Sequence, residues 1–407
     1  MEASVTEEYG GKQVTRQSLE PLTGLRFLAA LWVVVYHYTI EFRFTALKEE
    51  IHYIYGHHTP FDVLILQGHL AVDFFFLLSG FILAYTYTTT KGTLRGSRQA
   101  FWVARIARIY PVYLLGLLLA FWPYMSQHAN PWDVVTSGVA HLLMIHAWLP
   151  STLDWNQPSW SLSVEALFYA LFPLLLPLFA RQGRRGLWVL FIGSWLLFGL
   201  DMYLLVFAGG QTGLAEQSWW SSVVRYNPLV SLPEFLAGMA LGLLFVKRSA
   251  STVSRARRMS GLAFDAVVIG VALCLAALLL ALYKLGLMTM DYDSMAPFAL
   301  PLLAALMYVL AFKRGITARV LSIPVVVWLG EISYGIYILH VPLWELLSGF
   351  AEKTFNFAPD NVIIVPVYGL LLLAVAGLSF RYIERPARRA IRARWGQPKR
   401  VLAPSVV

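Results

Sequence analysis

The 407-residue chain is 58% hydrophobic and only 14% charged, with a formal net charge of +9. Soluble domains average about 25% charged residues, so this composition excludes an ordinary soluble protein and indicates a membrane protein. The basic residues lie in short clusters between apolar stretches, a distribution that excludes a nucleic-acid-binding surface and is typical of charges that orient membrane helices.

Ten apolar segments are long enough to cross a hydrocarbon core about 30 Å thick. In chain order the predicted spans are 25–43, 68–88, 102–123, 158–180, 187–207, 228–246, 262–283, 294–312, 320–346 and 361–382. Threaded alternately, they put 27 of the 32 Lys and Arg residues on one side, which the positive-inside rule assigns to the cytoplasm. We therefore expect an all-α polytopic bundle whose two termini are both cytoplasmic.

The segment 132–150, WDVVTSGVAHLLMIHAWLP, is the exception to this threading. An eleventh crossing here would move the basic loop 181–185, RQGRR, to the outer side and reverse its charge agreement. We expect a short interfacial or re-entrant helix on the outer side instead. The predicted organisation is a cytoplasmic tail over 1–24, one transmembrane domain over 25–382 and a basic cytoplasmic tail over 383–407.

The first span, GLRFLAALWVVVYHY, carries Arg26 and His37, which are eleven residues apart. Three helical turns separate them, so both side chains share one face, about 16 Å apart along the axis. Arg26 is expected near the inner edge and His37 near mid-membrane. Ionisable groups in a bilayer are costly and indicate function.

Four further polar groups interrupt the apolar spans. In chain order they are Asp73 with Ser79-Gly80, Arg105 with Arg108, Ser161 with Glu165, and Ser333 with Tyr337 and His340. Single members have ordinary explanations, such as helix contacts or orienting charges. A carboxylate such as Glu165, about two turns below the outer surface, must instead be paired, protonated or hydrated. Together the groups predict a shared polar cavity, a buried reaction or transport site. The pair His57-His58 has no further ligands at suitable spacing, so no metal site is predicted.

With these motifs assembled, the chain resembles the acyltransferase-3 family of bacterial integral-membrane O-acyltransferases. The motifs that carry the resemblance are Arg26-x10-His37, Ser79-Gly80-Phe81, the basic pair Arg105 and Arg108, Trp160-Ser161-x3-Glu165, and the stretches SYGIYILH and RYIERPARR. They occur in the expected order from about residue 20 to 390.

The resemblance implies transfer of an acyl group, most often acetyl from acetyl-CoA, to a sugar hydroxyl of an exported glycan in the bacterial inner membrane. The implied partners are acyl-CoA, a glycan or lipid-linked sugar and membrane lipid, with no nucleic acid and no permanently bound cofactor. Some members carry a C-terminal extracytoplasmic esterase-like domain. The chain stops about 20 residues after its last predicted span, so a separate extracytoplasmic acyl-handling protein is expected wherever that step is needed.

The resemblance and the positions of the residues together suggest roles. The expected catalytic residues are His37, Arg26 and Glu165; the expected donor-binding residues are Arg105, Arg108 and Ser79; the expected cavity residues are Trp160, Ser161, Asp73, Tyr337 and His340. Arginines near the inner edge suit the phosphates of coenzyme A. His37 is expected to be a general base or a transient acyl carrier, with Glu165 acting on it from the outer side or holding the sugar.

Other classes of protein stay open at this point. A secondary transporter or flippase of a glycan or lipid-linked sugar would equally use ten spans with buried His and Glu residues. Against it, the sequence shows no inverted repeat, and its polar groups gather in the first five spans. A membrane sensor or scaffold leaves Arg26, His37 and Glu165 unexplained. The acceptor, the acyl chain length, the membrane face of the reaction and the oligomeric state are not fixed by the sequence.

Overall fold

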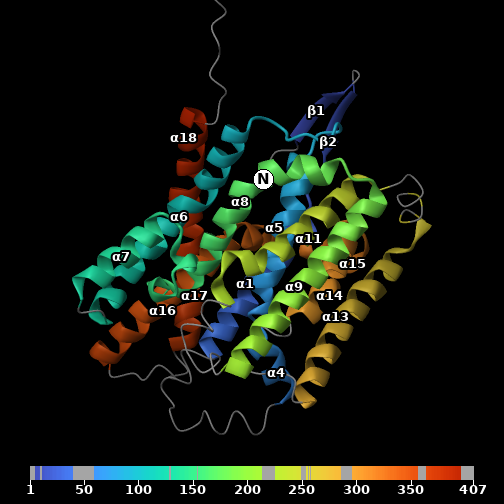
Figure 1. The fold of residues 1–407 in the computed structure, drawn as a ribbon. Helices are drawn as coiled ribbons and strands as arrows, with labels where there is room; N and C mark the ends of the chain where they lie inside the picture. The colour runs from blue at the N-terminus through green and yellow to red at the C-terminus, as the bar shows by residue number, and fades with distance from the viewer. Residues whose placement is uncertain are drawn as a thin grey trace, which may run out of the picture.

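The computed structural model describes residues 5–9, 12–39, 59–127, 130–153, 155–212, 225–248, 254, 256, 258–285, 296–355 and 364–395. This part of the chain is almost entirely helical, as predicted (Figure 1). The main helices are α1 (Glu20–His37), α4 (Pro60–Leu66), α5 (Leu70–Tyr87), α6 (Arg98–Gln127), α7 (Pro131–Leu142), α8 (Trp160–Ala180), α9 (Arg184–Thr212), α11 (Pro228–Val246), α13 (Gly261–Lys284), α14 (Ala296–Leu310), α15 (Gly315–Leu321), α16 (Pro324–Phe355), α17 (Ile364–Ser379) and α18 (Arg385–Trp395).

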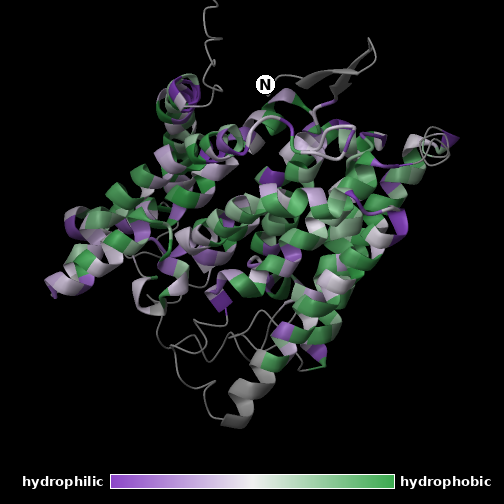
Figure 2. Ribbon diagram, turned by 45° about the horizontal axis from the view of Figure 1, so that its top comes forward, coloured by the Kyte–Doolittle hydropathy of each residue, from purple (hydrophilic) through white to green (hydrophobic). Residues whose placement is uncertain are grey.

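Every one of the ten predicted spans contains a helix. By length and composition, eight helices of the described chain can cross a membrane, or nine if α14 and α15, which meet at 85°, form one broken span. The difference from ten is α1, whose apolar residues are diluted by Glu20, Arg26 and His37. Hydrophobic residues cover most of the helices, while hydrophilic ones gather toward their ends, as on α18 (Figure 2). The protein is a multi-pass membrane protein.

The ends of the chain add two features that the sequence did not predict. A hairpin of β1 (Val5–Tyr9) and β2 (Lys12–Arg16) precedes α1. At the other end, α17 continues through a π-helical turn, η6 (Phe380–Glu384), into α18. The hairpin and α18 lie at the same end of the bundle (Figure 1), so the two tails approach one membrane face.

The segment predicted to be interfacial or re-entrant folds as the 12-residue α7, followed by three 3₁₀ turns, η2 (His146–Trp148), η3 (Pro150–Thr152) and η4 (Gln157–Ser159). A helix of this length is about 18 Å long, too short to cross the hydrocarbon core. Its exposed side chains include Trp132, Val135 and Val139. Apolar side chains on one exposed face are typical of a helix that lies in the membrane interface.

Two histidines are buried at the end of α7 and in the turn η2 that follows it. His141 and His146 have no exposed surface, and their rings stack with centroids 4.0 Å apart. Nδ1 of His141 donates a hydrogen bond to the Ser137 carbonyl, 2.9 Å away, and the hydroxyl of Ser159 lies 3.2 Å from Nε2 of His146. Burial lowers the pKa of His141 to about 4 and that of His146 to about 3. Both rings are therefore neutral at pH 7.

This pair makes folding stability depend on pH. Each pKa is lower in the folded chain than the ordinary 6.5, so below pH 6.5 the unfolded chain binds more protons than the folded chain. The free energy of unfolding therefore decreases as the pH falls from 6.5 toward the pKa values of the folded chain. The expected slope is about 1.4 kcal/mol per pH unit for each histidine. Thermal unfolding in detergent should show a lower melting temperature at pH 5.5 than at pH 7.5, and His146→Gln should reduce that difference. An unchanged pH dependence in the variant would contradict the assignment.

Helices α5 and α11 pack side by side through glycines. A Cβ atom at Gly80 would overlap the carbonyl oxygen of Phe235, and one at Gly238 would overlap that of Leu77. Small residues allow such close backbone approach between membrane helices. The structural explanation of Ser79-Gly80 as a helix contact therefore holds for Gly80.

Gly238→Ala should destabilise the protein by about 1–3 kcal/mol, because the added methyl group forces α5 and α11 apart. Gly270→Ala is the matched control, since nothing lies within 4 Å of a Cβ at Gly270 in α13. Relief of the glycine entropy cost should leave the control unchanged or slightly more stable. Apparent melting temperatures in detergent compare the two variants, and equal effects would contradict the close packing of α5 on α11.

Candidate active site

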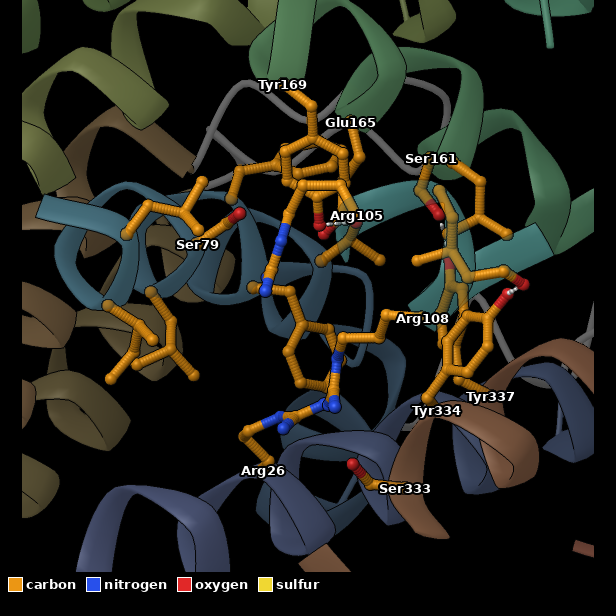
Figure 3. Close-up of a pocket in the computed structure, with 18 residues that line it drawn as sticks. Arg26, Ser79, Arg105, Arg108, Ser161, Glu165, Tyr169, Ser333, Tyr334 and Tyr337 are labelled. Carbon is orange, nitrogen blue, oxygen red and sulfur yellow. Dashed lines mark hydrogen bonds between the residues drawn. The ribbon is translucent and has the colours of Figure 1, made fainter. Parts of the chain in front are cut away.

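A cavity of about 150 Å³ lies where five helices, α1, α5, α6, α8 and α16, converge (Figure 3). Its polar lining consists of Arg26, Ser79, Arg105, Arg108, Ser161, Glu165, Tyr169, Ser333, Tyr334 and Tyr337. Seven residues that the sequence singled out as catalytic, donor-binding or cavity residues meet here. The predicted shared polar cavity is thus present, inside the membrane domain.

Three arginines, Arg26 from α1 with Arg105 and Arg108 from α6, point into this cavity (Figure 3). Arg105 donates a hydrogen bond of 3.0 Å to the hydroxyl of Tyr87, and its guanidinium lies 5.4 Å from that ring's centroid and 6.0 Å from that of Tyr169. Aromatic faces stabilise a planar cation and fix its orientation. The Arg105 side chain is therefore held in place by the protein itself.

Glu165 shares the cavity with the arginines. It accepts a hydrogen bond from the hydroxyl of Tyr169, one helical turn further along α8. The sequence analysis placed Glu165 on the outer side and Arg105 and Arg108 on the inner side, and the structure brings them together instead. The reason is that α8 begins deep inside the protein, because the turn η4 before it is buried and the carbonyl of Pro158 accepts a hydrogen bond from Tyr337.

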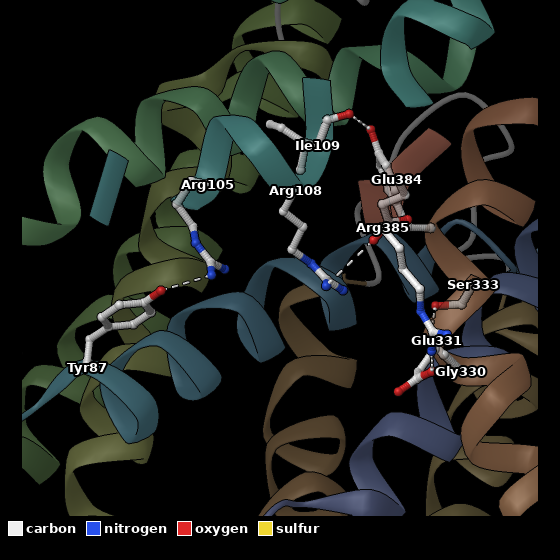
Figure 4. Close-up of polar contacts among 10 residues, drawn as sticks. Tyr87, Arg105, Arg108, Ile109, Gly330, Glu331, Ser333, Glu384 and Arg385 are labelled. Atoms are coloured by element: carbon white, nitrogen blue, oxygen red, sulfur yellow. Dashed lines mark hydrogen bonds and ion pairs between the residues drawn. The ribbon is translucent and has the colours of Figure 1, made fainter. Parts of the chain in front are cut away.

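Two ion pairs lie at the turn that leads into α18, and one of them involves the cavity residue Arg108 (Figure 4). Arg108 lies 4.0 Å from the carboxylate of Glu384, which is buried in the π-helical turn. Arg385 pairs with Glu331 of α16 at 3.1 Å. Glu384 belongs to the stretch RYIERPARR, but no role was predicted for it from the sequence. An acidic residue among arginines at the end of a span is the signal that could have indicated it.

His37 and His340 lie against each other beside the cavity. Nδ1 of His37 is 3.2 Å from Nε2 of His340, and the ring centroids are 4.9 Å apart. Helices α1 and α16 approach closely because Gly330 leaves room for the backbone at Thr23. The ring of Tyr337, a cavity residue, has its centroid 6.0 Å from that of His340. The pair therefore lies one side chain away from the lining of the cavity.

Three expected cavity residues lie outside the lining of this cavity, as far as the structure describes it. His340 belongs to the histidine pair instead. Trp160 packs against Phe76 and Tyr226, with centroid distances of 5.8 and 5.0 Å. Asp73 is buried in the first turn of α5. One face of a helix contacts several neighbouring helices in the bundle. The spacing of residues along the sequence does not specify which of these helices a given side chain meets.

A second polar cluster borders His37, and the sequence did not predict it. Arg225 donates a hydrogen bond of 3.3 Å to the hydroxyl of Tyr36. The ring of Tyr36 meets His37 and His69 edge-on, at centroid distances of 5.0 and 5.8 Å. His37 thus contacts both His340 and the ring of Tyr36, which belongs to this second group of hydrogen-bonding side chains.

Comparison with known proteins gives the site its chemistry. A family profile described as an acyltransferase domain matches residues 20–381. The acyltransferase MdmB of Streptomyces mycarofaciens is 28% identical over 398 residues, which cover 92% of each chain. The peptidoglycan O-acetyltransferase OatA of Listeria monocytogenes is 23% identical over 399 residues, and the O-acetyltransferase OatA of Staphylococcus aureus is 22% identical over 402 residues.

The extent of these matches differs. The alignments with OatA cover 93% of this chain but only 57% and 58% of the two relatives, so the chain spans somewhat more than half of their length. No solved structure matches the chain. The family profile, however, spans nearly all of the membrane domain, including Arg26, His37 and Glu165. The chain belongs to the acyltransferase-3 family and is a membrane acyltransferase.

Proposed function

We propose that the chain transfers an acetyl group from acetyl-CoA to a hydroxyl of a cell-surface or exported glycan. The observation that carries the proposal is the convergence of Arg26, Arg105 and Arg108 on one cavity inside the membrane domain, one side chain away from the pair His37 and His340. This arrangement offers a place for an anionic donor beside a group that can accept a proton.

The charge of the cavity favours an anionic donor. Three guanidinium groups face a single lining carboxylate, that of Glu165. Guanidinium groups bind phosphate oxygens through paired, charge-assisted hydrogen bonds, which suits the phosphates of coenzyme A. The hydroxyl of Ser79 lies in the same lining and adds a neutral donor. With the basic-rich end of the bundle in the cytoplasm, acyl-CoA enters from the face that holds both tails.

His37 is the proposed general base. It takes the proton of the acceptor hydroxyl while the oxygen attacks the thioester carbonyl carbon; the new C–O bond forms, the C–S bond breaks, and the proton passes on to the departing thiolate. Arg26 and Glu165 balance charge in the cavity that holds the donor. The polar cluster of Tyr36, His69 and Arg225 offers hydrogen-bonding groups for a sugar beside His37.

The relatives support the acetyl donor and the glycan acceptor. Two of them are named as O-acetyltransferases, one of these for peptidoglycan, although both are much longer than this chain. MdmB, which matches over nearly its whole length, is named only as an acyltransferase. We therefore propose a glycan hydroxyl as the class of acceptor and name no particular glycan.

The test uses the purified protein in liposomes with acetyl-CoA labelled in its acetyl group. Solubilised peptidoglycan fragments and a capsular or lipid-linked oligosaccharide serve as acceptors. We expect release of free coenzyme A and a label on the saccharide that mild base removes, as for an O-acetyl ester. A protein that moves glycan across the membrane without consuming acetyl-CoA, or that labels none of these acceptors, would overturn the proposal.

A further inference from the structure

We propose that His340 is a positioning residue that, together with the carbonyl of Val33, fixes the tautomer of His37, so that Nε2 of His37 is the atom that takes the acceptor's proton. The inference rests on the proposed function, in which His37 is the general base. It concerns the pair of histidines that α1 and α16 bring together from positions 303 residues apart in the chain.

The tautomer of His340 follows from its surroundings. The side chain has no exposed surface, and a charged imidazole is costly inside a membrane domain, so the ring is neutral. Its Nδ1 hydrogen-bonds to the carbonyl oxygen of Tyr337. A carbonyl only accepts, so Nδ1 of His340 carries the hydrogen, and Nε2 presents a lone pair toward His37.

The tautomer of His37 follows in turn. Its Nδ1 lies 3.0 Å from the carbonyl oxygen of Val33 and 3.2 Å from Nε2 of His340. Both neighbours are acceptors, so Nδ1 of His37 carries the hydrogen and shares it between them. Nε2 of His37 is then the basic nitrogen. In a neutral imidazole, the hydrogen bond made by one ring nitrogen determines whether the other nitrogen carries a hydrogen or a lone pair.

The protein braces His340 in this orientation. Pro342 has no N–H to donate to the carbonyl of Ile338, four residues earlier in α16. The side-chain amide of Asn156 donates to that carbonyl instead, at 3.2 Å. The hydroxyl of Tyr368 donates to the carbonyl of His340 at 2.9 Å. The backbone around His340 is therefore held by two side chains from other parts of the fold.

The arrangement has a chemical consequence. When Nε2 of His37 accepts the hydroxyl proton, the ring becomes positive and its bond from Nδ1 to His340 becomes charge-assisted. That bond strengthens as the reaction proceeds, so it lowers the barrier rather than tightening the ground state. His340 exchanges no proton, and the proton leaves His37 from Nε2 to the thiolate.

Two amide variants separate positioning from a structural role. In His340→Gln the side-chain oxygen can replace Nε2 as the acceptor for His37, whereas in His340→Asn the amide can replace only Nδ1 and its bond to Tyr337. We expect Asn to lower kcat by about 10- to 100-fold, as loss of one hydrogen bond to a charged group does, with the KM for acetyl-CoA unchanged. Gln should retain most of the activity.

The opposite order would overturn the inference, because a residue that merely stabilises α16 through the Tyr337 carbonyl would tolerate Asn better than Gln. Ser379→Ala, which removes a buried hydroxyl beside Gly335 of α16, is the control for general loosening and should keep kcat within a few-fold of wild type. Acetyl transfer by the wild type tests the proposed function separately.

A direct measurement does not depend on how the His340 variants fold. ¹⁵N NMR of histidine-labelled wild-type protein distinguishes protonated from unprotonated ring nitrogens, and the signals absent from His37→Gln identify His37. We expect hydrogen on Nδ1 and a lone pair on Nε2 of His37 at pH 7.5. Hydrogen on Nε2 of the neutral ring would overturn the inference.

Discussion

Replacing His37 by glutamine should lower kcat by about 10²- to 10⁴-fold, the range that a positioned general base contributes. Glutamine keeps a polar side chain of similar length but cannot take up a proton at neutral pH. Arg26, Arg105 and Arg108 stay in place, so acetyl-CoA should still raise the melting temperature of the variant by mass action. Steady-state release of coenzyme A, measured with saturating acceptor, gives kcat.

A variant that transfers acetyl groups at the wild-type rate would remove His37 from the mechanism. A second experiment, on the wild-type protein, distinguishes a general base from a covalent acyl carrier. Wild type is mixed with acetyl-CoA without acceptor, quenched and digested. We expect no acetyl group on the peptide that contains His37, whereas an acetylated His37 would assign it as the carrier.

Replacing Arg105 by alanine should weaken acetyl-CoA binding by about 10- to 100-fold, since a hydrogen bond to a charged group contributes about 1.5–3 kcal/mol. Arg105 lines the cavity and is oriented by Tyr87 and Tyr169, so its loss removes a cation that is already in position. The measurement is the rise in melting temperature with increasing acetyl-CoA, which should disappear at concentrations that stabilise wild type.

Two variants sharpen this test. Arg105→Lys keeps the charge but loses the planar fork, so its binding should fall between those of wild type and the alanine variant. Arg185→Ala removes one positive charge from an exposed position at the start of α9 and should bind as wild type does. If alanine at Arg105 leaves the stabilisation intact, the donor does not contact this arginine.

The bilayer explains how much of the fold could be predicted. Each of the ten predicted segments contains a helix, because a chain segment that crosses the hydrocarbon core as a single unit must be a long apolar helix. Such segments can be recognised from local composition. The short α7 was predictable for the same reason, from its length and from the basic loop that follows α8. The hairpin β1–β2 and the bend between α14 and α15 depend on contacts that composition does not record.

The sequence singled out seven of the residues that line the cavity as site residues, but it did not predict their geometry. Arg26, Arg105 and Glu165 were recognisable because ionisable groups within apolar spans are rare. Their common cavity depends on how deep α8 begins, which is set by the buried turn before it rather than by hydropathy. The contact of His37 with His340 joins the first span to the ninth, and no pattern along a single helix specifies such a pairing.

Glu384 places a carboxylate beside one of the cavity arginines. The carboxylate is 1% exposed and sits 4.0 Å from Arg108, so it neutralises a guanidinium that would be costly to leave uncompensated in a membrane domain. If Arg108 binds the donor as we propose, a donor phosphate competes with this carboxylate for the same cation. Donor binding would then exchange one anion for another, and the displaced anion would belong to the turn that joins α17 to α18. Such an exchange would change the contacts of the C-terminal helix whenever the donor binds.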